Sequence, residues 1–494
     1  MKLLLLLGYG VLPSVAQSTP PRTVPQGLAS DITTYLATSA GSQTTLSKQF
    51  MFANINVPGA ANGTVIAAQS YTAPNYAYNW VRDASLTMDV VQQLYAAATL
   101  QTAKNNYSSM LFAYANARVT EQNDPNLQTG LGEPKFNLDN SVFTGPWGRP
   151  QNDGPATAAI TLMEFATTYI KYGGSEDDIN KSIYLGPVKT DLLFVAANWS
   201  SPSFDIWEEE SSTHFYNHLV SHKALSMGAS FAATMGDSET STTLSAAASA
   251  VAQTLPSFWD ESRAIIDFQI GPVQKDKTSY QDIAVILGII HGYNNDGIYS
   301  YSNDQVLSTA YHLCLSFQQT YPIATSQTVD NNGGALGIPI GRYPEDVYNG
   351  DGTSPNGGNP WFLATAAMAE LFYRAASEIN DAKTLTVTNT SLAFYNYFAP
   401  NANLTVTQYA SSTANFVTAV ASLEGWGDAF MRLIKFHGGQ SGHLSEEYDR
   451  NTGYETGAAD LTWSYASVLT AALARAELSG NSSYAGALAN LGFS

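Results

Sequence analysis

Five parts of the sequence combine aromatic rings with carboxylates and, in most cases, an arginine. They are residues 76–83, 132–137 with 147–153, 204–209, 341–346 with 359–361, and 444–449. Trp and Tyr rings pack on the apolar face of a pyranose, while Asp and Arg side chains form bidentate hydrogen bonds with its hydroxyls. These residue types together predict a binding site for a sugar.

Two of these segments carry paired carboxyls that are suited to glycoside hydrolysis. That reaction needs one protonated carboxyl to release the leaving oxygen and one ionised carboxyl to activate water. An indole and a second carboxyl, Trp207 and Glu209, flank Glu208 and favour its protonated form, which makes Glu208 a candidate acid. Glu446, in a distant segment, is a candidate base. A solvated acidic loop is the alternative for either pair taken alone.

Other catalytic chemistries have weaker signals. The Gly-rich stretch at 332–335 follows no predicted strand, so we reject it as a phosphate loop, and Gly-x-Ser-x-Gly is absent. His214, His218 and His222 recur every four residues, and we interpret them as helix-surface histidines rather than metal ligands. Cys314 lies in an apolar helical pattern and is predicted to be a buried filler. We therefore expect no metal site.

The composition indicates a globular protein with an acidic surface. The 494 residues carry 22 Lys and Arg against 41 Asp and Glu, so the formal net charge is 22 − 41 = −19. Hydrophobic residues make up 44%, which is enough for a large core and excludes intrinsic disorder. The negative charge argues against nucleic acid or an anionic membrane as partner. At about 150 residues per domain, the length alone would suggest three domains.

The N-terminus has the pattern of a secretory signal. A basic start, an apolar stretch and a small-x-small site predict a signal peptide over 1–16, followed by an extended lead-in over 17–27. We therefore expect a secreted protein that is not held in a membrane once the signal is removed. Candidate glycosylation sites are Asn62, Asn106, Asn180, Asn198, Asn389, Asn403 and Asn481.

Long helical patterns alternate with the aromatic loops. The i, i+3/i+4 spacing predicts helices at 86–95, 156–172, 187–199, 215–235, 242–255, 303–321, 361–379, 416–437 and 461–478. Strand patterns are few and short, as at 384–388, so we expect an all-α fold. Asp83, Asp153 and Asp460 stand where helices should begin and are predicted N-caps. If alternate helices run in the same direction, these loops gather at one end of a helical barrel.

Eight segments resemble, in order, those of the fungal and yeast glucoamylases, the family 15 glycoside hydrolases. The matching segments are 80–83, 131–137, 147–155, 205–209, 341–346, 359–363, 444–449 and 460–465. This resemblance implies an (α/α)6 barrel with a pocket at one end and a single catalytic domain over 28–494. Catalytic segments spread from Arg82 to Asp460 leave no room for separable modules, and we expect no separate starch-binding domain.

The resemblance also implies roles for individual residues. Glu208 corresponds to the general acid and Glu446 to the general base. The substrate-binding residues implied are Tyr76, Trp80, Arg82, Asp83, Trp147, Trp207, Glu209, Arg342, Tyr343, Asp346 and Trp361. The implied activity is that of EC 3.2.1.3, without a cofactor, in a monomer. It releases β-D-glucose with inversion from non-reducing ends of α-1,4-glucans (starch, glycogen, maltodextrins) and acts more slowly on α-1,6 links.

Some positions depart from the family pattern, and alternatives stay open. Phe143 stands where many relatives have Tyr, Val81 replaces a usual Thr, and Ala459 stands where relatives often have Arg. The same pocket could serve another α-glucoside, such as trehalose or isomalto-oligosaccharides. A glucan-binding protein without catalysis and a polysaccharide lyase on a similar helical toroid are further alternatives.

Overall fold

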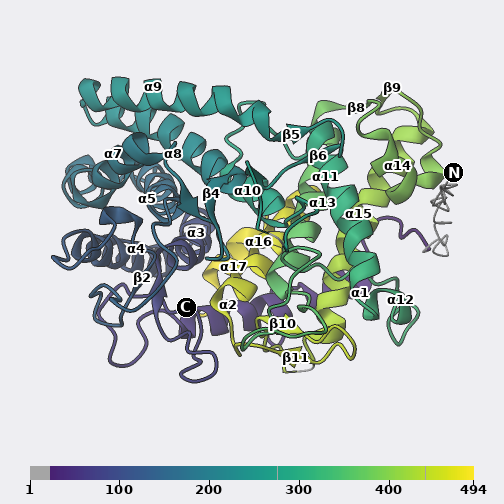
Figure 1. The fold of residues 1–494 in the computed structure, drawn as a ribbon, viewed down its shortest axis with the longest axis horizontal. Coiled ribbons are helices and arrows are strands. Elements are labelled where there is room, and N and C mark those ends of the chain that lie inside the picture. Colours follow the sequence, from purple (N-terminus) through teal and green to yellow (C-terminus); the bar gives the residue numbers. More distant parts are fainter. Residues whose placement is uncertain (1–22, 275, 440, 494) are drawn as a thin grey trace, which may run out of the picture.

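The computed structural model describes residues 23–493 except 275 and 440, so the predicted signal peptide lies outside the described residues. Six helices form a closed inner ring in which each packs against the next. They are α3 (Val81–Ala97), α5 (Asp153–Lys171), α8 (Phe215–Thr234), α10 (Ala284–Gly292), α13 (Phe362–Ala382) and α16 (Thr462–Leu478). The ring closes where α16, near the end of the chain, contacts α3, near its start (Figure 1).

An outer helix precedes each inner helix in the chain. The outer helices are α2 (Gln43–Ala53), α4 (Gln101–Gln122), α7 (Lys189–Asn198), α9 (Ser238–Thr254), α11 (Asp304–Thr320) and α15 (Ala414–His437). Inner helices such as α13 are apolar on nearly every side because both their faces are covered. This alternation is the (α/α)6 toroid, and the expected fold class is confirmed.

The remaining elements are short and lie mostly between these helices. The strands form antiparallel pairs or one three-stranded sheet: β1 (Asn79–Trp80) with β2 (Lys135–Phe136), β3 (Ser203–Phe204) with β4 (Ser211–His214) and β7 (Gln269–Ile270), β5 (Trp259–Asp260) with β6 (Ile265–Ile266), β8 (Thr384–Val387) with β9 (Thr407–Ala410), and β10 (Glu447–Tyr448) with β11 (Glu455–Thr456). The short helices are α1 (Ser30–Tyr35), α6 (Glu176–Ile179), α12 (Ile323–Ser326), α14 (Leu392–Phe398) and α17 (Tyr484–Asn490), with single helical turns or kinked segments at η1 (Gly130–Gly132), η2 (Asn180–Val188), η3 (Leu255–Phe258) and η4 (Pro400–Ala402).

Buried ion pairs tie neighbouring helices together, both between the two layers and within the outer one. On one side of the ring, Arg475 of α16 binds Asp428 of α15 at 2.7 and 2.9 Å, and the Tyr373 hydroxyl of α13 donates to the same carboxylate. On another, Arg118 of α4 binds Asp191 of α7 at 2.8 Å. Removing one partner of a buried pair costs about 3–5 kcal/mol, so these contacts hold the layers in register.

Several local expectations were wrong. The aspartates predicted as N-caps make no side-chain cap: Asp83 and Asp153 lie inside the first turns of α3 and α5. Their carboxylates still face the positive ends of helix dipoles, which explains why acidic residues gather there. His214, His218 and His222 are buried rather than on the surface, and each ring bonds to a backbone carbonyl. Cys314 is fully buried in α11, as predicted.

The periodicity missed the inner helix α10 and the outer helices α2 and α4. Residues of α10 form one continuous apolar run, whereas α4 is polar over much of its length, so neither shows a clear amphipathic pattern.

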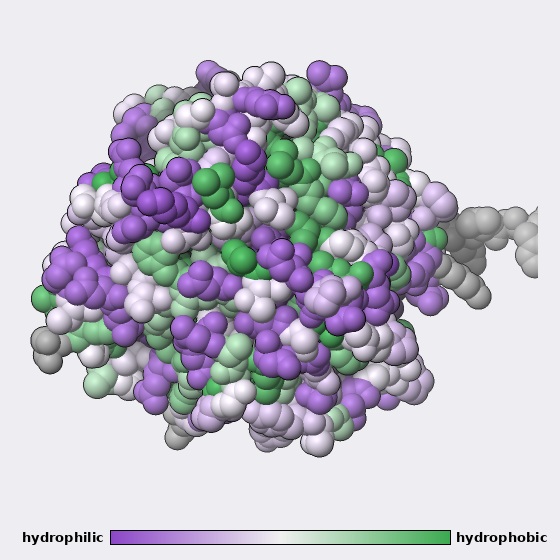
Figure 2. All heavy atoms as spheres, turned by 90° about the vertical axis from the view of Figure 1, so that its left-hand side faces the viewer, coloured by the Kyte–Doolittle hydropathy of each residue, from purple (hydrophilic) through white to green (hydrophobic). Residues whose placement is uncertain are grey.

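Hydrophilic residues are interspersed with small groups of hydrophobic ones on the face shown in Figure 2. Within the described residues, every helix is too short or too polar to cross a bilayer.

Candidate active site

The N-terminal ends of inner helices and the loops before them surround a cavity of about 370 Å³. This size is within the range of small-molecule sites. The cavity is lined by Ala67, Tyr76, Trp80, Arg82, Asp83, Trp147, Gly148, Ile206, Trp207, Glu208, Glu209, Arg342, Tyr348, Trp361, Glu446, Leu461 and Trp463. The predicted gathering of the aromatic loops at one end of the barrel is therefore confirmed.

Glu208 lies on the loop between β3 and β4 in a left-handed conformation, with φ at +67°. Such a conformation costs about 1–3 kcal/mol for a residue with a side chain and occurs preferentially at functional sites. Its Oε1 accepts hydrogen bonds from Trp80 Nε1 at 2.7 Å and Gln151 Nε2 at 2.9 Å. Arg82 Nη2 lies 4.0 Å from the same oxygen. The antiparallel β1–β2 pair positions Trp80, which lies opposite Lys135 in the register.

Glu446 immediately precedes the β10–β11 hairpin and is 1% exposed. Its Oε1 accepts from the Tyr76 hydroxyl at 3.0 Å, and its Oε2 from the Tyr348 hydroxyl and the Ala458 N–H, both at 3.3 Å. Burial raises the pKa of Glu446 to about 7, while these donors and the charge of Arg342 act in the opposite direction. The neighbouring Glu447 is fully buried as well, and burial beside Glu446 raises its pKa well above the usual range.

Charged groups on the cavity wall hold one another in place. Arg82 binds Asp153 at 2.9 Å and Gln151 at 3.0 Å. Burial raises the pKa of Asp83 to about 6, although the adjacent Arg82 lowers it. Arg342 binds Asp346 through two bonds, at 2.8 and 2.6 Å, and reaches Glu209 at 2.9 Å.

Aromatic rings make up much of the remaining wall. Trp207 lies 5.5 Å from Trp361 and stacks on Trp463 at 6.4 Å, measured between ring centroids. Trp80 and Trp147, which also line the cavity, lie 5.9 Å apart in an edge-to-face arrangement. The indole N–H groups of Trp147 and Trp361 are buried and have no acceptor among the described residues. The site thus offers apolar faces and several hydrogen-bonding groups together.

Most of the predicted site residues meet in this cavity, but two lie behind it. Asp346 is 4% exposed and faces Arg342, and Tyr343 donates its hydroxyl to Glu209 at 2.9 Å. Both therefore act through a neighbour. Sequence reasoning missed Tyr348, Gln151 and Trp463 as wall or contact residues. Gln151 and Trp463 stand within matched segments, which was the available signal, whereas Tyr348 stands in no matched segment.

The structure also shows how possible metal ligands and the candidate glycosylation sites are arranged. No three His, Cys, Asp or Glu side chains of the described residues gather to hold a metal ion. Five candidate asparagines are exposed: Asn62, Asn106, Asn389, Asn403 and Asn481. Asn180 and Asn198 are half-buried, and the Asn198 amide donates to Phe194 O at 2.9 Å.

Comparisons with known proteins agree with this geometry. The chain is 53% identical over 487 residues to a glucoamylase of Blastobotrys adeninivorans, covering 97% of this chain and 78% of the relative. It is 37% identical over 456 residues to Glucoamylase 1 of Rhizopus oryzae, covering 92% and 73%. The solved glucoamylase of Saccharomycopsis fibuligera superposes with a TM-score of 0.82 at 30% identity, covering 93% of this chain and 98% of the other. The model of "Glycosyl hydrolases family 15" matches residues 45–473, and the chain therefore belongs to that family.

Proposed function

We propose that this protein is a glucoamylase (EC 3.2.1.3), which releases β-D-glucose from the non-reducing ends of α-1,4-glucans with inversion. Starch, glycogen and maltodextrins are the substrates, and α-1,6 links are cut more slowly. One observation carries the proposal: Glu208 and Glu446, from distant loops, line one cavity with aromatic walls. Family membership and the glucoamylases among the relatives support the substrate class.

Glu208 is the proposed general acid. Both of its hydrogen bonds to described residues fall on Oε1. Oε2 accepts no hydrogen bond from these residues, so it can carry the proton that is transferred to the glycosidic oxygen. Proton delivery in the transition state speeds the departure of the leaving sugar.

Glu446 is the proposed general base. Its three donors stabilise the ionised carboxylate, which takes a proton from a water molecule on the face of the sugar opposite Glu208. Attack by that water inverts the anomeric carbon, so an α-linked chain yields β-glucose.

The other cavity residues bind the substrate, and three charged ones hold its terminal glucose. We propose that Arg82, Asp83 and Arg342 bind its hydroxyls, because hydrogen bonds to charged groups are stronger than those between neutral groups. The Trp207 and Trp361 rings pack on its apolar faces. Tyr76, Trp80, Trp147 and Glu209 complete the substrate contacts.

NMR of the first product from maltose tests the proposal. Inversion predicts that β-glucose appears first and equilibrates slowly with the α anomer, whereas α-glucose as the first product would refute it. Parallel assays on trehalose and isomaltose test the alternative substrates. Higher kcat/KM on either of these than on maltose would favour another α-glucosidase.

The organisation of the chain belongs to the same proposal. We propose one catalytic domain over 28–494, supported by a connected hydrophobic core that runs from Ile32 to Ala489. Secretion after removal of residues 1–16 and a monomeric state also remain predictions.

A further inference from the structure

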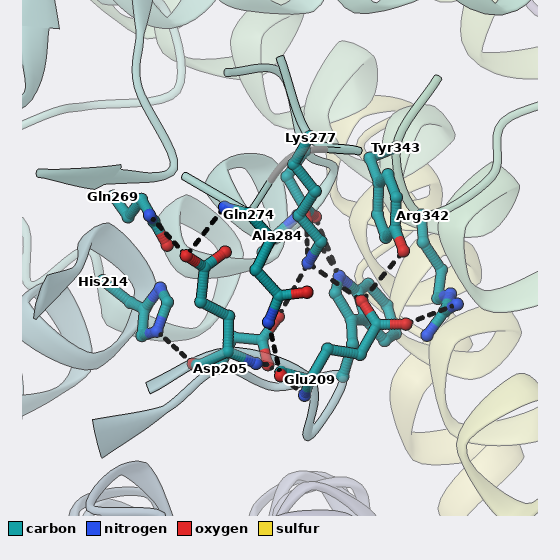
Figure 3. A network of polar contacts seen from close by, with 12 residues as sticks. Asp205, Glu209, His214, Gln269, Gln274, Lys277, Ala284, Arg342 and Tyr343 are labelled. Atoms are coloured by element: carbon teal, nitrogen blue, oxygen red, sulfur yellow. Dashed lines mark hydrogen bonds and ion pairs between the residues drawn. The ribbon is translucent and has the colours of Figure 1, made fainter. Parts of the chain in front are cut away.

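A single buried lysine lies among three carboxylates behind the cavity wall. Lys277 Nζ is 2.9 Å from Asp205, 3.0 Å from Glu209 and 3.9 Å from Asp282, and the residue is 3% exposed (Figure 3). The ammonium also lies 4.2 Å from the centre of the Tyr343 ring. A buried charge is costly unless it is paired, and these carboxylates supply the pairing. Lys277 belongs to none of the matched motifs.

Of the three carboxylates, only Glu209 reaches the cavity. Its side chain is 28% exposed, against 4% for Asp205 and 1% for Asp282. Three side chains hold it: Lys277 and the Tyr343 hydroxyl on Oε2, and Arg342 on Oε1. A carboxylate held from three sides presents a fixed acceptor to a sugar, because little rotamer freedom remains to be lost on binding.

The position of Glu209 assigns it to the sugar that leaves. The acid marks the side on which the glycosidic oxygen departs. Glu209 follows Glu208 on the same loop and is far more exposed than the base, Glu446, at 1%. The leaving chain must extend toward solvent, so the more exposed carboxylate lies on its path.

The other two carboxylates have anchors that do not involve Lys277. Asp205 accepts the backbone N–H of Glu209 at 2.7 Å and of Glu210 at 3.2 Å. Asp282 accepts the Trp207 indole N–H at 2.9 Å and the Ala284 N–H at 2.8 Å. The loop that carries Glu208 therefore keeps several ties of its own when Lys277 is altered.

We propose that Lys277 is a positioning residue for recognition of the leaving sugar: it fixes Glu209, so that cleavage of a glucose–glucose bond depends on Lys277. This inference rests on the proposed function. A glucoside whose leaving group is not a sugar should be far less sensitive to Lys277.

Maltose and α-D-glucosyl fluoride separate the two cases, because fluoride makes no sugar contact as it leaves. Lys277→Met should lower kcat/KM on maltose about tenfold or more, the size of a lost charged hydrogen bond, and change it about twofold or less on the fluoride. Lys277→Arg should restore most of the activity on maltose. Lys181→Gln is the matched control, because Lys181 and Asp177 form an exposed pair with 70% and 82% exposure.

A double-mutant cycle between Lys277 and Glu209 provides the decisive test. In a Glu209→Gln background, Lys277→Met should cause little further loss on maltose, because the two act through one contact. Independent, multiplicative losses would overturn the proposal. Equal losses on both substrates would do so as well, because they would indicate general support of the acid loop.

Tyr343→Phe covers the case in which Lys277→Met does not fold. It removes a donor from Glu209 and keeps every charge, so thermal unfolding should be nearly unchanged while maltose is affected more than the fluoride. The same small effect on both substrates would refute the assignment of Glu209 to the leaving sugar. If the unaltered enzyme cleaves neither substrate, the proposed function fails instead.

Discussion

The two carboxyls of the cavity are held in contrasting ways. Glu208 lies on a strained loop, its side chain is 18% exposed, and both hydrogen bonds from described side chains fall on one oxygen. Glu446 is 1% exposed and receives donors on both oxygens. One carboxyl thus keeps an oxygen for a transferable proton, whereas the donors on the other oppose the burial that raises its pKa. The comparison shows how neighbours can give two identical side chains opposite tasks.

Substitution of the proposed acid is the sharpest test of this contrast. Glu208→Gln should lower kcat on maltose roughly 1,000-fold with little change in binding, because it removes a proton delivered only in the transition state. α-D-Glucosyl fluoride needs less protonation of its leaving group and should be affected much less. Steady-state kinetics on both substrates measure the difference. Near-normal turnover of maltose would show that Glu208 is not the acid.

The base should behave differently on the same two substrates. Glu446→Gln should lower kcat roughly 100-fold on maltose and on the fluoride alike, because both reactions need an activated water. The same assays apply, with circular dichroism to confirm folding. If the fluoride were spared, as in the acid variant, the two sides of the cavity would not differ as proposed.

A smaller effect should come from the donors on the base. The Tyr76 hydroxyl stabilises ionised Glu446, so Tyr76→Phe should raise the pKa of that carboxyl further. Because the base must be ionised, activity should then be lost at a higher pH as the solution is acidified. The acidic limb of kcat/KM should shift upward by up to about one pH unit. Tyr71→Phe, at a residue that is 57% exposed, is the control. A downward shift would contradict this account.

The smallest expected effect concerns the acid side. Phe143 packs edge to face on Trp147 at 5.8 Å between centroids. Phe143→Tyr adds a hydroxyl beside Trp147 and should change KM for maltotriose by about twofold or less, because one solvated hydrogen bond contributes little. A large change in kcat would mean that this ring contributes to the chemistry as well as to binding.

Local sequence signals predicted most of the helices and most of the cavity residues. Helical spacing depends on residues three and four apart, so the boundaries of α8, α11 and α16 follow from the chain itself. The loops at 204–209 and 444–449 were recognisable because they combine paired acids with aromatic rings and stand among eight segments in the order of the family. The pattern failed where burial on all sides removes periodicity, as in α10, and where Asp83 and Asp153 lie in helical turns rather than at caps.

The sequence by itself thus determined most of the helices, the segments that carry the chemistry and the two carboxyls that are candidates for catalysis. The tertiary structure alone decided which side chains reach the cavity. Closure of the ring brings Tyr348 onto Glu446, places Asp346 and Tyr343 behind their neighbours, and brings Lys277 between three carboxylates. Asp346 is only four positions from Arg342, but the contacts of Tyr348 with Glu446, of Tyr343 with Glu209 and of Lys277 with Asp205 join residues 98, 134 and 72 positions apart, and no local spacing specifies them. They exist because six helices pack into one ring, and packing is a property of the whole chain.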